Sequence, residues 1–392
     1  MEKLVTSKDF PSADGFIYLN AANISLVYQG ATDALVDWYK DTSLHGSNNF
    51  DEVAEVNTFE DLRQATAQML NANPEDIAVG SSATELLSSL AWAVLAGAET
   101  NVVCTKIVFP STVYPWRRVG SHSGCEIRLA ESAGDFVNED DIIDLIDQNT
   151  AVVSISHVEY SNGQCFDLDK LSAAAHEKGA LLVVDATQSM GAIPIDVAET
   201  AVDALVSGSY KWLCAPMGAA VMYLAPELQS DLEPGLVGFR SHNNMWDLEA
   251  GRLDYPDTAK KFEFSTMAYG CAIALARSME FINSIGVDRV FAHNRDLADH
   301  LSEGLRSQGA TIVSDPDKGY QSSIVSAALS GMDSSKAIKQ LEEARVYVSS
   351  RADSIRFSPH LYNHKGDIDN VLDHMKRIFG KIIKNETGGK YV

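Results

Sequence analysis

Cysteine is scarce and scattered in this sequence. The 392 residues include five cysteines, an odd number with no Cys-x-x-Cys pair among them. This pattern argues against a disulfide framework and against a metal site, and it favours a reducing, cytoplasmic location. A Gly-x-Gly-x-x-Gly motif is also missing after the apolar runs, which argues against a nicotinamide-dependent dehydrogenase.

Basic residues are outnumbered, and long apolar runs are missing. The sequence has 31 lysines and arginines against 54 aspartates and glutamates, a formal net charge of -23. Such a charge repels nucleic acid and anionic membranes, and neither is expected as a partner. The most apolar helical stretch, LLSSLAWAVLAGA, is shorter than the ~18–20 residues that span a bilayer. The first residues, MEKLVTSKDFPSADGF, lack the basic and then apolar pattern of a signal peptide.

Short apolar runs alternate with helical segments between about residues 75 and 225. The runs NVVCTKIV, AVVSISHV, ALLVVDAT and AAVMYLA are typical of buried strands, and segments such as ATELLSSLAWAVLAG and DLDKLSAAAHEKG are typical of helices. This alternation predicts an α/β fold, with a mostly parallel sheet and helices on both faces. After about residue 260 a long helical pattern leads into a second, smaller α/β domain.

Two charged residues stand at the ends of neighbouring predicted strands. Asp185 closes the apolar run LLVVD, where a carboxylate is costly to bury without a cationic partner. A protonated pyridine nitrogen is such a partner, although a cap or turn role explains Asp185 equally well. Lys211 follows the next run, in SGSYKWL, and a Schiff base with an aldehyde would remove its charge. The alternative is a lysine whose amino group reaches the surface.

Two further features follow earlier predicted strands. Small and hydroxyl residues in VGSSATELL open a helix, which suits a phosphate group but is also the pattern of an ordinary N-cap. Phe109 in KIVFPST could lie flat on a ring, although a Phe at a strand end is usually part of the core. Ligands of open α/β sheets bind beyond the carboxyl ends of the strands, so the four features together predict a site for pyridoxal 5'-phosphate (PLP).

The motifs VVDATQSMGAIPIDV, SGSYKWL and FEFSTMAYG resemble those of the class V aminotransferase family of fold-type I PLP enzymes, which includes cysteine desulfurases, kynureninases and isopenicillin-N epimerase-like proteins. The resemblance runs from YLNAAN to IRFSPHLYN and implies a mostly parallel seven-stranded sheet. We expect an N-terminal segment at 1–20, a large PLP-binding domain at 21–262 and a small C-terminal domain at 263–392.

The resemblance also implies the roles of individual residues. Lys211 would carry the Schiff base, Asp185 would pair with the pyridine nitrogen, and Gln188 would contact the phenolic oxygen. Thr266 would reach the phosphate of a neighbouring subunit in a homodimer with shared active sites, and Arg356 would bind the substrate carboxylate. The remaining implied contacts are ring stacking by Phe109 and phosphate binding by Ala83, Thr84, Ser209 and Tyr210.

The sequence departs from the desulfurase pattern near the carboxylate-binding arginine. Desulfurases carry a nucleophilic cysteine on a loop there, whereas EARVYVSSRADSIRFS holds none, so persulfide formation is not expected. Tyr210 replaces a desulfurase histidine and resembles kynureninase. In EYSNG, either Tyr160 or Asn162 is a candidate for contact with the cofactor.

We therefore expect an enzyme that acts on a small α-amino acid, as an aminotransferase or a β-eliminating C–S lyase. An epimerase, a Cα–Cβ bond-cleaving or bond-forming enzyme, and a PLP-binding protein without turnover are the alternatives. Arg351 and Arg240 are candidates for a second acidic group of the substrate, or are surface or structural arginines. The residues that could shape specificity, or serve only as caps and turns, are Asn20, Asn23 and His45.

Overall fold

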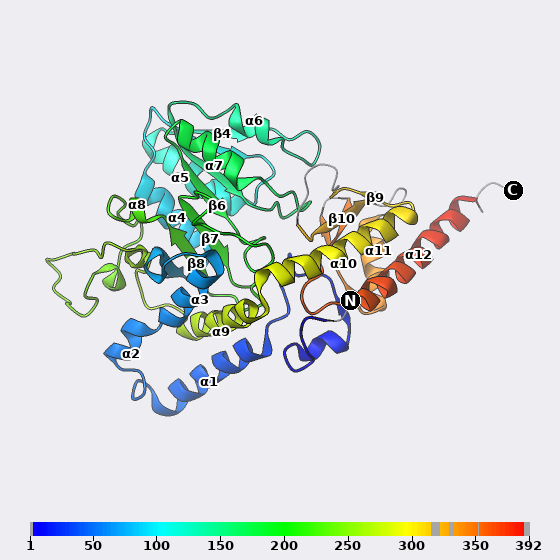
Figure 1. Ribbon diagram of the computed structural model, residues 1–392, viewed down its shortest axis with the longest axis horizontal. Helices are drawn as coiled ribbons and strands as arrows, with labels where there is room; N and C mark the ends of the chain where they lie inside the picture. Colours follow the sequence, from blue (N-terminus) through cyan, green and yellow to red (C-terminus); the bar gives the residue numbers. More distant parts are fainter. Residues whose placement is uncertain (1–2, 315–321, 329–332, 352, 388–392) are drawn as a thin grey trace.

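The computed structural model describes residues 3–314, 322–328, 333–351 and 353–387. Figure 1 shows a large lobe built around a central sheet and a smaller lobe that contains the C-terminal helix. In the described part of the chain, no helix combines the length and the apolar character needed to cross a membrane.

The central sheet has seven strands in the order β2-β8-β7-β6-β5-β3-β4. All neighbours are parallel except β8, which is antiparallel to both β2 and β7. The predicted mostly parallel seven-stranded sheet is confirmed. The strands are β2 (Ile77–Gly80), β3 (Asn101–Thr105), β4 (Glu126–Ala130), β5 (Thr150–Ser156), β6 (Leu181–Asp185), β7 (Ala204–Gly208) and β8 (Ala220–Leu224).

Helices cover both faces of this sheet. Successive residues of a strand point to opposite faces, so Val183 packs in one apolar cluster and its neighbours Leu182 and Val184 pack in another. Both faces are apolar, which explains the continuous apolar runs of the sequence. One face is covered by α4 (Ala83–Val94) and α5 (Pro110–Ser123), and the other by α3 (Glu60–Leu70), α7 (Leu168–Glu177) and α9 (Tyr269–Ile285).

Further helices complete the large lobe. Figure 1 shows α1 extending along one side of the lobe. These helices are α1 (Gln29–His45), α2 (Glu52–Asn57), α6 (Glu139–Ile143) and α8 (Pro226–Gln229), with the 3-10 helices η2 (Pro74–Asp76), η3 (Phe239–Ser241) and η4 (Ala259–Phe262).

The small lobe has a four-stranded antiparallel sheet in the order β12-β13-β10-β9. A separate pair joins β1 (Ile17–Tyr18) to β11 (Val346–Tyr347) in parallel, so the start of the chain is anchored in this lobe. The other elements are η1 (Pro11–Asp14), α10 (Val287–Ser307), β9 (Thr311–Ile312), β10 (Val325–Ala328), α11 (Ser334–Glu343), β12 (Ser349–Arg351), β13 (Ser354–Phe357) and α12 (Lys365–Thr387).

The apolar contacts bear on where one lobe ends and the next begins. Helix α9 packs in the core of the large lobe, and in α10 Val290 belongs to that core whereas Leu297 belongs to the core of the small lobe. Figure 1 shows α10 running from one lobe to the other. The expected boundary between 262 and 263 stays a prediction, and these contacts favour a boundary inside α10.

Candidate active site

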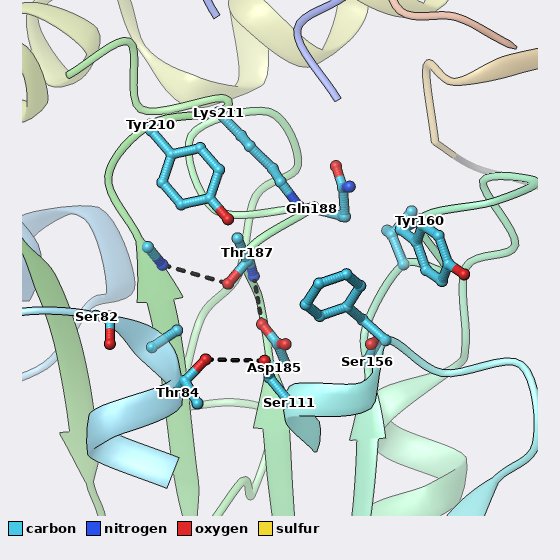
Figure 2. Close-up of a pocket in the computed structure, with 14 residues that line it drawn as sticks. Ser82, Thr84, Ser111, Ser156, Tyr160, Asp185, Thr187, Gln188, Tyr210 and Lys211 are labelled. Atoms are coloured by element: carbon cyan, nitrogen blue, oxygen red, sulfur yellow. Dashed lines mark hydrogen bonds between the residues drawn. The ribbon is translucent and has the colours of Figure 1, made fainter. Parts of the chain in front are cut away.

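A partly open cavity lies beyond the carboxyl ends of the central strands. It is bordered by the ends of β5, β6 and β7 and by the first residues of α4, where ligands of open α/β sheets bind. Figure 2 shows Lys211 and Tyr210 reaching into it from one side, opposite Asp185. Its lining consists of Ser82, Ala83, Thr84, Phe109, Ser111, Ser156, Val158, Tyr160, Asp185, Thr187, Gln188, Gly208, Tyr210 and Lys211.

Asp185 is the last residue of β6 and is only 6% exposed. Its Oδ1 accepts a hydrogen bond from the backbone N–H of Thr187 at 3.0 Å, and its Oδ2 accepts one from Oγ1 of Thr112 at 3.1 Å. Within the described ranges, no lysine or arginine forms an ion pair with this carboxylate. A buried carboxylate fixed by two hydrogen bonds and open to the cavity is suited to a cationic ligand atom.

Lys211 extends into the same cavity and is 9% exposed. Its Nζ lies 5.8 Å from the ring centre of Phe109 and 5.7 Å from that of Tyr210. Burial lowers the pKa of this amine to about 8, with the charges of Arg356 and Arg351 acting in the same direction and Asp185 opposing them. A substantial fraction of the amine is therefore neutral, and nucleophilic, near pH 8.

The start of α4 forms a cradle of small groups and hydroxyls. Ser82 caps this helix by accepting a hydrogen bond from the N–H of Glu85, and Oγ1 of Thr84 donates to Oγ of Ser111 at 2.8 Å. The first N–H groups of a twelve-residue helix, together with these hydroxyls, form a ready site for a phosphate.

Phe109 is 43% exposed, which distinguishes it from a core residue. Its ring packs edge-on against Tyr160, with 5.4 Å between ring centres and an interplanar angle of 82°. A ring that lines a cavity and is fixed by a neighbouring side chain can stack on a flat aromatic ligand. Tyr160 also lines the cavity, whereas Asn162 donates a hydrogen bond to the backbone oxygen of Asp135. Of these two candidates, the structure brings only Tyr160 to the site.

Gln188 lines the cavity with its amide held from two sides. Its Nε2 donates to the backbone oxygen of Ala22 at 3.0 Å, and its Oε1 accepts from Nε1 of Trp212 at 2.9 Å. These bonds fix the orientation of the amide and leave a second N–H for a ligand oxygen. They also attach the N-terminal segment to the edge of the cavity.

Three residues expected at the site are not among those lining the cavity. Ser209 is buried and its hydroxyl donates to the backbone oxygen of Pro216, so it holds the loop that carries Lys211. Thr266 is exposed, between η4 and α9. Arg356 is fully buried in β13; it donates from Nη1 to the backbone oxygen of Tyr160 and from Nε to Oγ of Ser349. Their expected ligand contacts stay predictions.

The other polar candidates of the sequence have structural contacts. Arg240 donates to the backbone oxygen of Glu55 and lies 3.8 Å from the carboxylate of Glu263. His45 pairs with Asp41 on α1 at 3.0 Å, and the backbone of Asn20 bridges to Ser358. Neither these residues nor Asn23 are among those lining the cavity.

Several hydroxyl residues that line the cavity were not predicted from the sequence. Thr187 follows Asp185 by two residues, and its Oγ1 accepts the backbone N–H of Gly208 at 3.2 Å, which ties the ends of β6 and β7 together. Its place in the DATQS motif was the available signal. Ser111 and Ser156 follow or end buried strands, as do the residues that were identified.

The residues of this cavity fit PLP. The amine of Lys211 and the carboxylate of Asp185 line one cavity, the hydroxyl cradle matches a phosphate, and the Phe109 ring offers a flat surface. These groups suit, in turn, an aldehyde, a ring nitrogen, a phosphate and an aromatic ring. Such a set defines a PLP-binding site of the fold-type I kind.

The sequence matches the aminotransferase class-V family over residues 17–371, and the chain belongs to this family. It is therefore a PLP-dependent enzyme. Among curated relatives, it is 27% identical to the uncharacterized aminotransferase YcbU of Bacillus subtilis, over 93% of this chain and 95% of that protein.

Solved structures share the fold over nearly the whole chain. A cysteine desulfurase from Thermococcus onnurineus superposes with a TM-score of 0.85 at 22% identity, covering 96% of this chain and 97% of that one. The cystine C–S lyase C-DES, as a mutant with glycine covalently linked to its PLP cofactor, gives a TM-score of 0.87 at 20% identity, covering 95% and 99%. The fold-type I architecture is confirmed.

Proposed function

We propose that this protein acts on a small α-amino acid as an aminotransferase or a β-eliminating C–S lyase, with Lys211 as the residue that attaches to PLP. The observation that carries the proposal is that Lys211 and Asp185 line one cavity, while neither forms an ion pair in the described part of the chain. The relatives named above include an aminotransferase and a C–S lyase, which supports these two reaction classes.

Lys211 has two tasks in this proposal. Its neutral amine would hold the cofactor through the aldehyde carbon, with loss of water, and would be freed when the amino group of the substrate takes its place. The released amine takes the proton from Cα of the substrate, a step favoured by its lowered pKa of about 8. The bound cofactor supplies the electron-withdrawing ring that makes this proton acidic.

Asp185 holds a proton on the ring nitrogen. Its carboxylate is fixed by Thr187 and Thr112, so it faces the cavity without a competing cation. The ring of Phe109 limits the tilt of the cofactor, and the free N–H of Gln188 donates to the phenolic oxygen. Ser82, Thr84 and the N–H groups of α4 bind the phosphate.

The fate of the proton held by Lys211 decides the reaction. Transamination would require Lys211 to move this proton away from Cα to the carbon that carried the aldehyde, whereas β-elimination would require it to protonate a group that leaves Cβ. Return to Cα would give the alternative, an epimerase. All five cysteines lie in the described residues and none lines the cavity, so a persulfide on a thiol of this chain is not part of the proposal.

We further propose a homodimer in the cytoplasm, in which Thr266 contributes to the partner's phosphate site. Thr266 is exposed, and five large apolar side chains are exposed on α1 and α2. Free cysteines suit a reducing compartment. The exposed apolar side chains on α1 and α2 are Val36, Tyr39, Leu44, Val53 and Val56. Light scattering that finds only the 42.5 kDa mass of one chain would contradict the dimer.

The central experiment labels the attachment point. Protein loaded with PLP is reduced with borohydride, digested and analysed by mass spectrometry, and we expect the adduct on Lys211. Lys211→Ala should lack both the adduct and the imine absorption band. An adduct on another lysine, with Lys211 unmodified, would overturn the proposal.

The reaction class is tested with a panel of amino acids. With a second keto acid supplied as amino acceptor, keto acid formed from the substrate without ammonia release indicates transamination, whereas ammonia together with a sulfur product indicates β-elimination. Exchange of the α-proton for deuterium with inversion at Cα, and without keto acid or ammonia, supports the epimerase alternative.

A further inference from the structure

Two arginines lie next to each other on the sheet of the small lobe. In the antiparallel pair β12–β13, Ser349 lies opposite Arg356, and Arg351 lies opposite Ser354. Residues that lie opposite each other, or two apart on a strand, point to the same face of a sheet. Arg351 and Arg356 are therefore diagonal neighbours on one face, where side chains are within mutual reach.

Neither guanidinium has an anionic partner among the described residues. Arg356 is fully buried, and its Nη2 has no hydrogen-bond partner. The Nε of Arg351 is likewise buried without a partner, while its Nη1 donates to the backbone oxygen of Ser350. Burial, and then the charge of Arg351, lowers the pKa of Arg356 to about 9. Two adjacent cations with unused donors are an unfavourable arrangement unless an anion binds there.

The two arginines are not among the residues lining the cavity, but Arg356 contacts one that is. Arg356 donates from Nη1 to the backbone oxygen of Tyr160, whose side chain lines the cavity. The charges of both arginines also act on the amine of Lys211. An amino acid whose nitrogen replaces Lys211 would therefore have its acidic groups close to both arginines.

We propose that the two arginines select an amino acid with an acidic side chain, with the α-carboxylate at Arg356 and the side-chain anion at Arg351. The inference rests on the proposed function, because it places the substrate in the cavity of Lys211. Arg356 already uses Nε and Nη1 for the protein, so it has room for one carboxylate. Arg351 is then the residue that determines specificity.

The test compares acidic amino acids with their amides, which have the same size. The PLP-loaded protein is titrated with aspartate, asparagine, glutamate and glutamine, and binding is followed by the change in cofactor absorption. We expect about tenfold tighter binding of the better acid than of its amide, since a charge-assisted hydrogen bond adds about 1.4 kcal/mol or more. Arg351→Gln should reduce this ratio to about 1 by weakening the acid alone, and Arg351→Lys should restore part of it.

Matched controls distinguish an effect of this site from an effect of the protein's overall charge. Arg377→Gln removes an exposed arginine of α12 in the same lobe and should leave the ratio unchanged. Succinate and glutarate have two carboxylates and no amino group, so they test the site without any reaction. They should raise the melting temperature of the wild-type holoenzyme more than they raise that of Arg351→Gln.

The outcomes distinguish this inference from the proposed function. If amino acids change the spectrum but acids and amides bind equally, the inference is overturned and the proposed function stands. Equal weakening of acid and amide by Arg351→Gln also overturns it, because both arginines would then share the α-carboxylate. If no amino acid changes the spectrum and borohydride leaves no adduct on Lys211, the proposed function fails.

Discussion

Replacing Lys211 with methionine should stabilise the protein in the absence of cofactor. The two side chains have similar length, and methionine adapts well to irregular apolar surroundings. The charged amine is buried without an anionic partner at contact distance, so the folded state pays a desolvation penalty that the variant lacks. We expect the variant to be more stable at pH 7.

The magnitude follows from the pKa of Lys211, which falls from 10.5 to about 8 in the folded protein. This difference corresponds to about 3 kcal/mol, because a tenfold change in an equilibrium constant is about 1.4 kcal/mol. The amine is protonated in both states below pH 8, so the penalty is complete there. It decreases as the pH rises toward 10.5, to about 2 kcal/mol at pH 9 and about 1 kcal/mol at pH 10.

The assay is thermal or urea unfolding of both cofactor-free proteins at several pH values between 7 and 10. Lys336→Met removes an exposed lysine of α11 and serves as the control, with no expected change. Equal or lower stability of Lys211→Met at pH 7 would refute the reasoning. A stabilisation that stays constant up to pH 10 would also refute it, because packing and not charge would then be the cause.

Three further substitutions test other contacts. Glu263→Gln should reduce the free energy of unfolding by about 3 kcal/mol in urea titrations, because the buried guanidinium of Arg63 loses the carboxylate at 2.7 Å and keeps only that of Glu60. Gly163→Ala should reduce it by about 1–3 kcal/mol, since φ is +80° and a Cβ would lie 2.8 Å from Cβ of Ile324. Asp185→Asn should slow α-deuterium exchange about a hundredfold or more while the Lys211 adduct still forms, because a neutral amide holds the ring proton poorly; an unchanged exchange rate would contradict that role.

The sheet and the main site residues could be predicted because local signals determine them. A strand buried on both faces is apolar throughout, so the run LLVVD predicts β6. The same run shows that Asp185 is a charged residue at the end of a buried strand. The same reasoning identified Lys211, which follows β7. At these positions, a polar residue next to an apolar strand was visible in the sequence itself.

Side-chain direction in loops could not be predicted in this way. Ser209 and Tyr210 are adjacent, yet only Tyr210 lines the cavity, because the turn after β7 points the Ser209 hydroxyl toward Pro216. Thr187 was missed for the same reason. The boundary between the lobes could not be predicted either. The apolar face of α9 is visible in the sequence, but the sequence does not show that this face packs in the core of the large lobe.

The pairing of β1 with β11 has a consequence for how the enzyme is made. Ile17 pairs with Val346, far along the chain, so β1 stays without this partner until β11 has been synthesised. The segment that follows β1 supplies the carbonyl of Ala22 that orients Gln188 at the cavity. A nascent chain therefore cannot complete the coenzyme pocket before β11 is made, and deleting either β1 or β11 would loosen the same edge of the catalytic centre.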